Sequence, residues 1–283
     1  MEQPVVIGLG EILWDMLPGG KRAGGAPVNF AYHAGMNHVE AWAISAVGDD
    51  ELGRELLEAA RYNGIRMMAE TVDHPTGTVK VELKGTIPNF IICEDVAWDY
   101  IPLSVQALTL VKRASAISFG TLAQRSECSK RTIQGLVKAA PAGALKVFDI
   151  NLRQNFYSKD IILESLEICN VLKINDEELA VVKKLFGLDC ISDEDFCISV
   201  IRRYGLKYLI LTAGASHSTV YGSDGKSSTI KTPETPVVDT VGAGDSFSGA
   251  FVAAVLNGAG MEEAHQKAVD AASATCSHAG AWK

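Results

Sequence analysis

Residues 239–256 read Asp-Thr-Val-Gly-Ala-Gly-Asp-Ser-Phe-Ser-Gly-Ala-Phe-Val-Ala-Ala-Val-Leu. Phe247, Phe251 and Val255 recur at helical spacing, which predicts a buried helix that begins at the glycine turn. The first amides of a helix have no partner within it, and the helix dipole favours negative charge at that end. The stretch therefore predicts a backbone site for an anion such as a transferring phosphoryl group.

Three residues of this turn suit a reaction at the anion. Gly242 and Gly244 place no Cβ between the backbone and a ligand and permit a positive φ. Asp245, in the first helical turn, is positioned to accept a proton from a hydroxyl in front of the amides. The simpler alternative is that Asp239 or Asp245 only caps a helix after a glycine turn. The motif Asp-Thr-x-Gly-Ala-Gly-Asp at 239–245 fixes six residue types, which seldom occur together by chance, so we favour the catalytic interpretation.

Length and composition limit the remaining possibilities. The chain has 283 residues, is 47% hydrophobic, and carries a net charge of −8. This length suits one large α/β domain, and the acidic balance argues against a nucleic-acid partner. The N-terminus lacks the pattern of a signal peptide, and the sequence has no uninterrupted apolar run of about 18 residues, so we expect no membrane span. Six cysteines without a regular framework favour the cytoplasm.

Short apolar runs alternate with amphipathic stretches along most of the chain. We predict strands at 5–10, 41–47, 116–119, 146–150, 171–174 and 208–212. We predict helices at 29–35, 50–62, 130–139, 160–169, 176–186 and 193–204. Continuous apolar strands separated by helices indicate a mostly parallel sheet covered on both faces.

Two segments interrupt this alternation. Residues 12–25 and 76–100 look like strands or loops without a crossover helix, and they have too little apolar mass for a core of their own. We expect them to form a small β lid over a cleft in a single domain that spans residues 1–283.

The stretch Asp-Thr-x-Gly-Ala-Gly-Asp resembles the second signature of the ribokinase-like (PfkB) carbohydrate kinases. Gly-Gly-Ala-Pro-Val-Asn at 24–29 resembles their first signature. The resemblance extends from Gly8 to Ala281. It implies a three-layer α/β/α fold with a β lid, ATP as donor, Mg²⁺, and a sugar hydroxyl as acceptor.

The resemblance also implies individual roles. Asp245 would deprotonate the attacking hydroxyl, and the amides of Gly242, Ala243 and Gly244 would form the anion hole. Residues implied to contact the sugar are Asp15, Gly24, Gly25, Asn29, Phe90 and Arg153. Two of these have ordinary alternatives: Asp15 could be a solvated turn carboxylate, and Arg153 could form a surface ion pair.

A second group of residues is implied at the nucleotide. These residues are Asn175, Thr212, Gly214, Gly242, Gly244 and Ala271. Glu178 would act on Mg²⁺ through water, although Asn175 followed by acidic residues is also a common helix start. An alanine-rich packed helix is an equal alternative around Ala271. The family further allows a monovalent cation such as K⁺ near Asp239 and Ser277, and a homodimer formed through the lid.

Gly-Glu-x-Leu-x-Asp at 10–15 and Asp-x-Asn-x-Arg at 149–153 are more similar to fructokinases than to ribokinases. The resemblance therefore implies phosphorylation of fructose at its 6-hydroxyl. A 2-keto-3-deoxygluconate kinase, another hexose or pentose kinase, and a non-catalytic sugar sensor are the alternatives. A dinucleotide-binding dehydrogenase, suggested by Gly8 and Gly10, fits less well because Leu13 stands in place of the third glycine.

Overall fold

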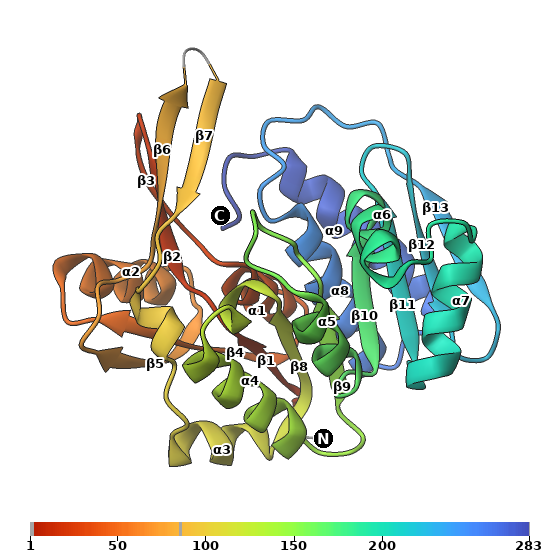
Figure 1. Ribbon diagram of the computed structural model, residues 1–283, viewed down its shortest axis with the longest axis horizontal. Coiled ribbons are helices and arrows are strands. Elements are labelled where there is room, and N and C mark those ends of the chain that lie inside the picture. The colour runs from red at the N-terminus through yellow and green to blue at the C-terminus, as the bar shows by residue number, and fades with distance from the viewer. Residues whose placement is uncertain (1–2, 85–86, 283) are drawn as a thin grey trace.

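A large, mostly parallel sheet forms the centre of the protein (Figure 1). The computed structural model describes residues 3–84 and 87–282, and in this part of the chain the sheet has nine strands. Their order is β13 (Ser227–Lys231), β12 (His217–Gly222), β11 (Tyr208–Ala213), β10 (Val171–Asn175), β9 (Leu145–Asp149), β8 (Ala114–Gly120), β1 (Val5–Leu9), β4 (Glu40–Gly48) and β5 (Arg66–Val72). All neighbouring pairs from β11 to β5 in this order are parallel, whereas β12 is antiparallel to both of its neighbours, β11 and β13.

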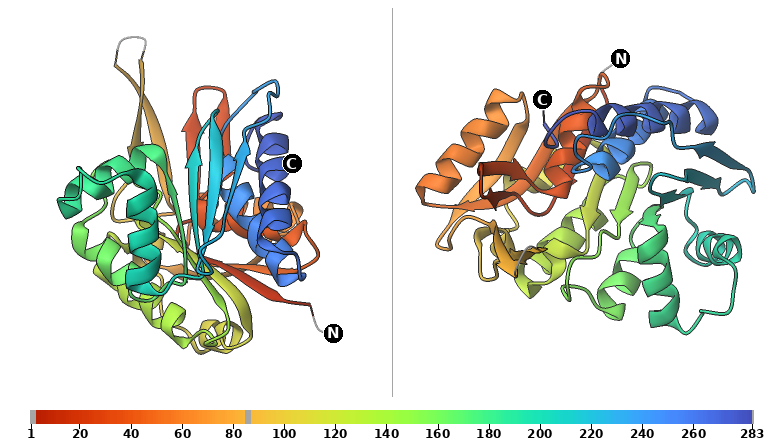
Figure 2. Two further views of the ribbon diagram at one scale, coloured as in Figure 1. Left: turned by 90° about the vertical axis from the view of Figure 1, so that its right-hand side faces the viewer. Right: turned by 90° about the horizontal axis from the view of Figure 1, so that it is seen from above.

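Helices cover both faces of this sheet (Figure 2). One face carries α1 (Ala26–Gly35), α2 (Glu51–Tyr62), α8 (Ala243–Leu256) and α9 (Met261–Cys276). The other carries α3 (Val105–Val111), α4 (Glu127–Ala139), α5 (Lys159–Leu166), α6 (Asp176–Phe186) and α7 (Asp193–Tyr204). The predicted three-layer α/β/α architecture is thus confirmed. No helix within the described residues is both long and apolar enough to cross a lipid bilayer.

A second, four-stranded sheet extends away from the large one (Figures 1 and 2). Its order is β3 (Gly20–Gly24), β2 (Leu13–Leu17), β6 (Thr78–Lys84) and β7 (Ile87–Ile92). The end of the predicted lid segment does not belong to this sheet. Residues Ala97–Tyr100 form a short 3₁₀ helix in which Trp98 is fully buried in the main core. Because the apolar side chains of this segment pack in the main core, the segment cannot extend the second sheet, which ends at β7.

Several elements differ from the prediction for identifiable reasons. Helix α1 begins at Ala26, three residues early, because Gly25 takes φ 125° and a proline occupies the first turn. Strands β5, β12 and β13 and helix α3 were not predicted. Strands β5 and β13 are the two edge strands of the sheet and are partly exposed. Strand β12 is mostly buried, but its sequence begins His-Ser-Thr rather than with a continuous apolar run.

The topology fixes where a ligand site can lie. From β1 the chain crosses to β4 on one side, whereas β8, β9, β10 and β11 follow on the other side. In open parallel sheets, ligands bind beyond the carboxyl ends of the strands, where the direction of winding reverses. The carboxyl ends of β1, β9, β10 and β11 and the N-terminus of α8 meet at this edge, beneath the second sheet.

Candidate active site

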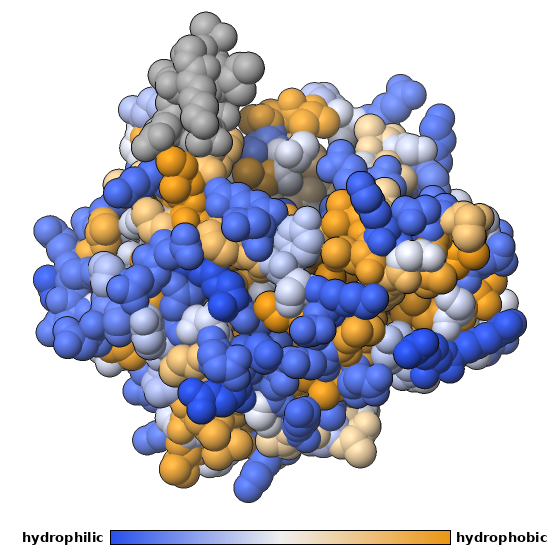
Figure 3. Space-filling model, in the orientation of Figure 1, coloured by the Kyte–Doolittle hydropathy of each residue, from blue (hydrophilic) through white to orange (hydrophobic). Residues whose placement is uncertain are grey.

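A cavity of about 1460 Å³ lies between the two sheets. Its hollow is visible beside the second sheet in the space-filling view (Figure 3). One end is lined by Asp15, Gly24, Phe90 and Arg153, and the other by Asn175, Thr212, Gly214 and Ala272. Drug-sized ligands occupy cavities of about 300–1,000 Å³, so this one can hold two such molecules. Asp245 also lines it.

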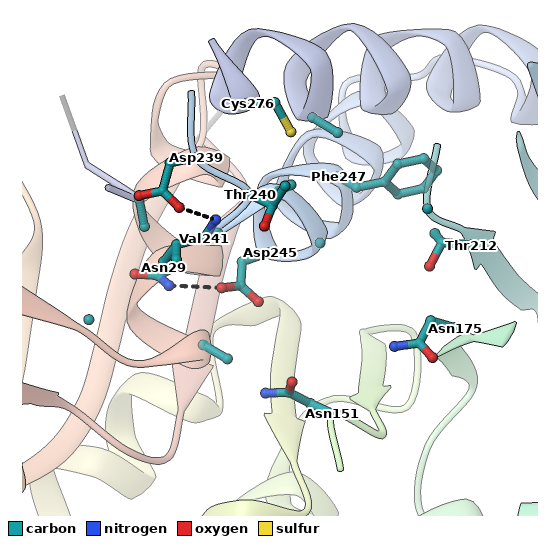
Figure 4. Close-up of a pocket in the computed structure, with 18 of the residues that line it drawn as sticks. Asn29, Asn151, Asn175, Thr212, Asp239, Thr240, Val241, Asp245, Phe247 and Cys276 are labelled. Atoms are coloured by element: carbon teal, nitrogen blue, oxygen red, sulfur yellow. Dashed lines mark hydrogen bonds between the residues drawn. The ribbon is translucent and has the colours of Figure 1, made fainter. Parts of the chain in front are cut away.

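Asp245 is held at the first turn of α8. The Asn29 amide donates to its carboxylate at 2.8 Å, from Nδ2 to Oδ2 (Figure 4). The helix cap, Gly242, has a φ of 79°, and a Cβ built on it would lie 2.6 Å from the Cβ of Ala281. Glycine is therefore required at this position both for its conformation and for the close approach of Ala281. The predicted helix start and the location of Asp245 agree with the structure.

The backbone amides of the glycine turn are not equally available. The Val241 amide donates to Asp239 at 3.1 Å, and the Ala243 amide donates to the Thr240 carbonyl at 3.2 Å. Among the described residues, the amides of Gly242, Gly244 and Asp245 have no hydrogen-bond partner. Of the three amides expected to bind an anion, the one of Ala243 is thus occupied within the turn.

The surroundings of Asp245 alter its acidity. Burial, together with repulsion from Asp149, raises its pKa to about 6. The hydrogen bond from Asn29 and the positive charges of Lys173 and Arg153 act in the opposite direction. A carboxyl group with this pKa is ionised at neutral pH yet basic enough to accept a proton during catalysis.

Lys173 is a site residue that the sequence analysis missed. It lies on β10, is 6% exposed, and its Nζ is 3.0 Å from Asp149 Oδ2. Burial disfavours its charge, but Asp149, Glu178 and Asp245 outweigh this effect and raise its pKa. A Cβ built on Gly244 would lie only 3.1 Å from Nζ, so the ammonium lies directly beneath the turn. A lysine within the apolar run Val-Leu-Lys-Ile was the available signal.

Glu11 is a second missed residue. It follows β1 and is 3% exposed; Oε1 accepts from the Ala26 amide at 3.3 Å, and Oε2 has no partner among the described residues. Burial is the main cause that raises its pKa to about 7, and the Asp245 charge adds to it. Glu11 and Asp245 also line a small cavity of about 10 Å³, which is room for about one water molecule.

The residues predicted to contact a sugar gather at one end of the cavity. Asp15 lies on β2 rather than in a solvated turn, and burial raises its pKa. The glycine turn beside it approaches closely: a Cβ built on Gly24 would lie 3.3 Å from Asp15 Oδ2, and one on Gly25 would lie 2.3 Å from the Glu11 carbonyl oxygen. Phe90 (50% exposed) and Arg153 also line this end.

Asn175 and Glu178 form a capping box at the start of α6. Asn175 Oδ1 accepts from the Glu178 amide at 2.8 Å, and Glu178 Oε2 accepts from the Asn175 amide at 3.0 Å. Oε1 of Glu178 accepts from the Leu152 amide at 3.0 Å. The helix-start interpretation is therefore correct, and both side chains also line the cavity. Figure 4 shows Asn175, Asn151 and Asp245 facing one space from three sides.

The nucleotide-side predictions differ in outcome. Thr212 and Gly214 line the cavity at the end of β11. Ala271 does not line it, whereas Ala272 and Ser273 of the same helix do, because each residue of a helix turns the side chain by about 100°.

The donor groups suit magnesium only through water. No group of three or more His, Cys, Asp or Glu side chains within residues 3–84 and 87–282 could enclose a metal ion. Each carboxylate oxygen of Glu178 accepts one backbone hydrogen bond, which leaves a lone pair for a water on Mg²⁺. Near Ser277, Asp239 already pairs with Arg22 at 3.0 Å, so a guanidinium supplies positive charge where the resemblance implied a monovalent cation.

The doubly covered sheet, the second sheet over a cavity, and the aspartate at a glycine-capped helix define the ribokinase-like class of α/β proteins. The chain belongs to the pfkB family of carbohydrate kinases, whose model matches residues 18–282.

Individual relatives agree with this assignment. Fructokinase-1 of Oryza sativa subsp. japonica is 26% identical over 275 residues, covering 89% of this chain and 83% of the relative. The fructokinase of Xylella fastidiosa with bound ATP superposes with a TM-score of 0.84 at 18% identity, covering 98% of this chain and 93% of that one. A double mutant of the fructokinase of Vibrio cholerae O395, with fructose, ADP and potassium ion bound, gives 0.82 at 19% identity and covers 99% and 94%.

Proposed function

We propose that the protein transfers the γ-phosphoryl group of ATP to the 6-hydroxyl of fructose. One observation carries this proposal: the Asp245 carboxylate and the unpaired amides of Gly242 and Gly244 border the same cavity. An acceptor hydroxyl bound between them can lose its proton to the carboxylate while the amides stabilise negative charge on the phosphoryl group.

The proposed reaction uses these groups in one step. The acceptor oxygen forms a bond to the γ-phosphorus, the bond from that phosphorus to the bridging oxygen breaks, and ADP leaves. Asp245 takes the hydroxyl proton. The amides of Gly242 and Gly244 donate to the oxygens of the transferring group, and the Lys173 ammonium beneath them adds positive charge. Mg²⁺, held by waters on Glu178, would neutralise phosphate charge.

The two ligands are proposed to occupy opposite ends of the cavity. Asp15, Asn29 and Arg153 offer acceptors and donors for the sugar hydroxyls, beside Gly24, Gly25 and Phe90. Asn175, Thr212 and Gly214 face the phosphates and ribose, and the small side chain of Ala272 leaves room for a flat base. We also propose that the protein acts in the cytoplasm, because ATP is available there and its six free cysteines would stay reduced. A homodimer through the second sheet remains a prediction.

Fructose is favoured over other sugars by the motifs at 10–15 and 149–153 and by the fructokinases among the relatives. A 2-keto-3-deoxygluconate kinase or another hexose or pentose kinase remains the alternative, because the same base and amides serve any primary hydroxyl. A coupled ADP-release assay with Mg²⁺ and a panel of these sugars separates them. We expect the highest kcat/KM with fructose; a higher value with another sugar would reassign the acceptor, and no ADP with any sugar would refute a kinase.

The Asp245→Asn variant tests the base in the same assay. Because a positioned general base typically contributes 10²–10⁴-fold, we expect kcat to fall by about that factor. The amide of asparagine retains the size of the side chain and can still bond to Asn29. Unchanged turnover would remove Asp245 from the mechanism.

A further inference from the structure

Trp282 is joined to Asp245 through a single buried side chain. Its indole Nε1 donates to Asn29 Oδ1 at 2.8 Å, and Asn29 Nδ2 donates to Asp245 Oδ2 at 2.8 Å. Asn29 is 4% exposed, so its side chain is largely shielded from bulk water. Trp282 and Asn29 are 253 positions apart in the sequence, and no local pattern links them.

The chemistry of the indole gives this chain of bonds a direction. An indole N–H can only donate, whereas the two ends of an asparagine amide differ: one accepts and the other donates. The contact with Trp282 therefore turns the oxygen of Asn29 toward the indole and the NH₂ toward Asp245. The flipped amide would set donor against donor at Trp282 and acceptor against acceptor at Asp245.

The segment that carries Trp282 is anchored independently. The Gly280 amide donates to Asp239 Oδ2 at 3.0 Å. Ala281 is 2% exposed and packs where Gly242 has no side chain. Trp282 itself packs, partly buried, against the apolar cluster that includes Val28 and Ala31 of α1. These contacts place the indole without help from Asn29, so the indole can orient the amide rather than the reverse.

We propose that Trp282 is a positioning residue, which fixes the Asn29 amide so that its NH₂ group donates to the Asp245 carboxylate. The inference rests on the proposed function, because it assigns Trp282 a role only through the base. A donated hydrogen bond favours the ionised form of a carboxyl group, which is the form that can accept a proton.

Other charged groups face Asp245 and must stay constant in a test. Asp149 on β9 and Glu11 after β1 oppose its ionisation, whereas Lys173 on β10 and Arg153 favour it. None of these four is among the residues that share a hydrogen bond with Trp282. A change at Trp282 therefore alters only one of the contributions to the ionisation of Asp245, namely the orientation of the Asn29 amide.

The test is the pH profile of kcat in Trp282→Phe, with fructose and Mg-ATP. Phenylalanine keeps an aromatic ring but lacks the N–H, so the amide can flip and present its oxygen to Asp245. We expect kcat at neutral pH to fall by about 3- to 10-fold, in keeping with the loss of one buried hydrogen bond. We also expect the acid limb of the profile to move up by roughly half a pH unit or more.

Trp42→Phe is the matched control. Trp42 is half-buried near the start of β4, and its Nε1 donates to Glu40 Oε1 at 2.8 Å, so the variant loses a bond of equal length away from the cavity. Its acid limb should match the wild type. A double-mutant cycle adds Asn29→Ala: if Trp282 acts through Asn29, Trp282→Phe should have little further effect in that background.

Two outcomes would overturn the proposal. A folded Trp282→Phe protein with the wild-type acid limb overturns it, as do additive effects in the cycle. If phenylalanine unfolds the chain, benzothienylalanine at position 282 keeps the fused rings and replaces the N–H with sulfur, and the same limb is measured. Failure of the proposed function is distinct, because the wild-type protein would then release no ADP with fructose, whatever residue stands at position 282.

Discussion

The carboxyl group of Asp245 has an unusual environment for an aspartate. It accepts a hydrogen bond from one neutral amide, lies near two positive side chains, and is repelled by the carboxylates of Asp149 and Glu11. Burial and repulsion outweigh the favourable contacts, so the group holds its proton to a higher pH than usual. The same arrangement that makes it a usable base therefore costs folding free energy whenever the group is ionised.

The pH dependence follows from this balance. The pKa of Asp245 is raised from 3.8 to about 6, so activity should be full above this value and should fall as the pH decreases through about 6. Stability has the opposite sign: between about pH 4 and 6 the folded state binds more protons than the unfolded state, so this group's contribution declines as the pH rises. Profiles of kcat/KM, which reports ionisations of the free enzyme, and of Tm measure the two effects. An acid limb near pH 4 would contradict the assignment of Asp245.

Gly244 gives a second prediction for a single residue. A Val side chain there would press on Lys173, whose Nζ is 3.1 Å from the position of the Cβ. We expect Gly244→Val to lower kcat by roughly 10²–10³, comparable to the loss of one oxyanion donor. Gly135→Val in α4 is the control, because no atom lies within 4 Å of a Cβ at that site. Equal kinetics in both variants would show that the space under the turn does not matter.

At the scale of elements, the second sheet is connected to the glycine turn at the start of α8 by few contacts. Arg22 of β3 pairs with Asp239, which also accepts from the amides of Val241 and Gly280. The amide of Gln154 donates to the carbonyl of Phe90 on β7. The base of the second sheet is anchored in the core through Leu13, Val79 and Ile92. Few polar contacts at the cavity suit a sheet that moves against the glycine turn while its base stays packed.

The variant Arg22→Met tests this connection. Because exposed ion pairs contribute only about 0.2–1 kcal/mol, we expect the KM for the sugar to rise by up to about fivefold, with a smaller change in kcat. Hydrogen exchange in β6 should slow on addition of sugar in the wild type and slow less in the variant. Arg54→Met, which removes an exposed pair with Asp49 at 3.5 Å, is the control. Identical exchange with and without sugar would argue against closure.

At the scale of the whole molecule, the cavity is shared by both sheets and by segments from most of the chain. A ligand that binds only the folded protein stabilises it by about 2.7 kcal/mol at 100 times its Kd. For a chain of this length that corresponds to an increase in Tm of roughly 5 °C.

We expect fructose and a non-hydrolysable ATP analogue each to raise Tm by about that amount, and the pair to raise it further. Differential scanning calorimetry with a panel of sugars measures the shift. A shift with another hexose or pentose, but none with fructose, would correct the sugar while leaving the kinase assignment in place.

The sequence alone determined the parallel sheet, most of its covering helices and the glycine turn from which helix α8 begins. These features depend on local periodicity, glycine conformation and helix termini, which a linear pattern records. The edge strands β5 and β13 were not predicted, because partly exposed polar segments carry a weak pattern.

Only the tertiary structure decided the residues that surround the base. Lys173 and Asp149 are 24 positions apart, and Trp282 and Asn29 are 253 apart. The first contact arises because the neighbouring parallel strands β9 and β10 end at one edge of the sheet. The second arises because the segment after α9, the last helix, packs against α1. Such proximity depends on the packing of whole elements, and periodicity within any single segment contains no information about it.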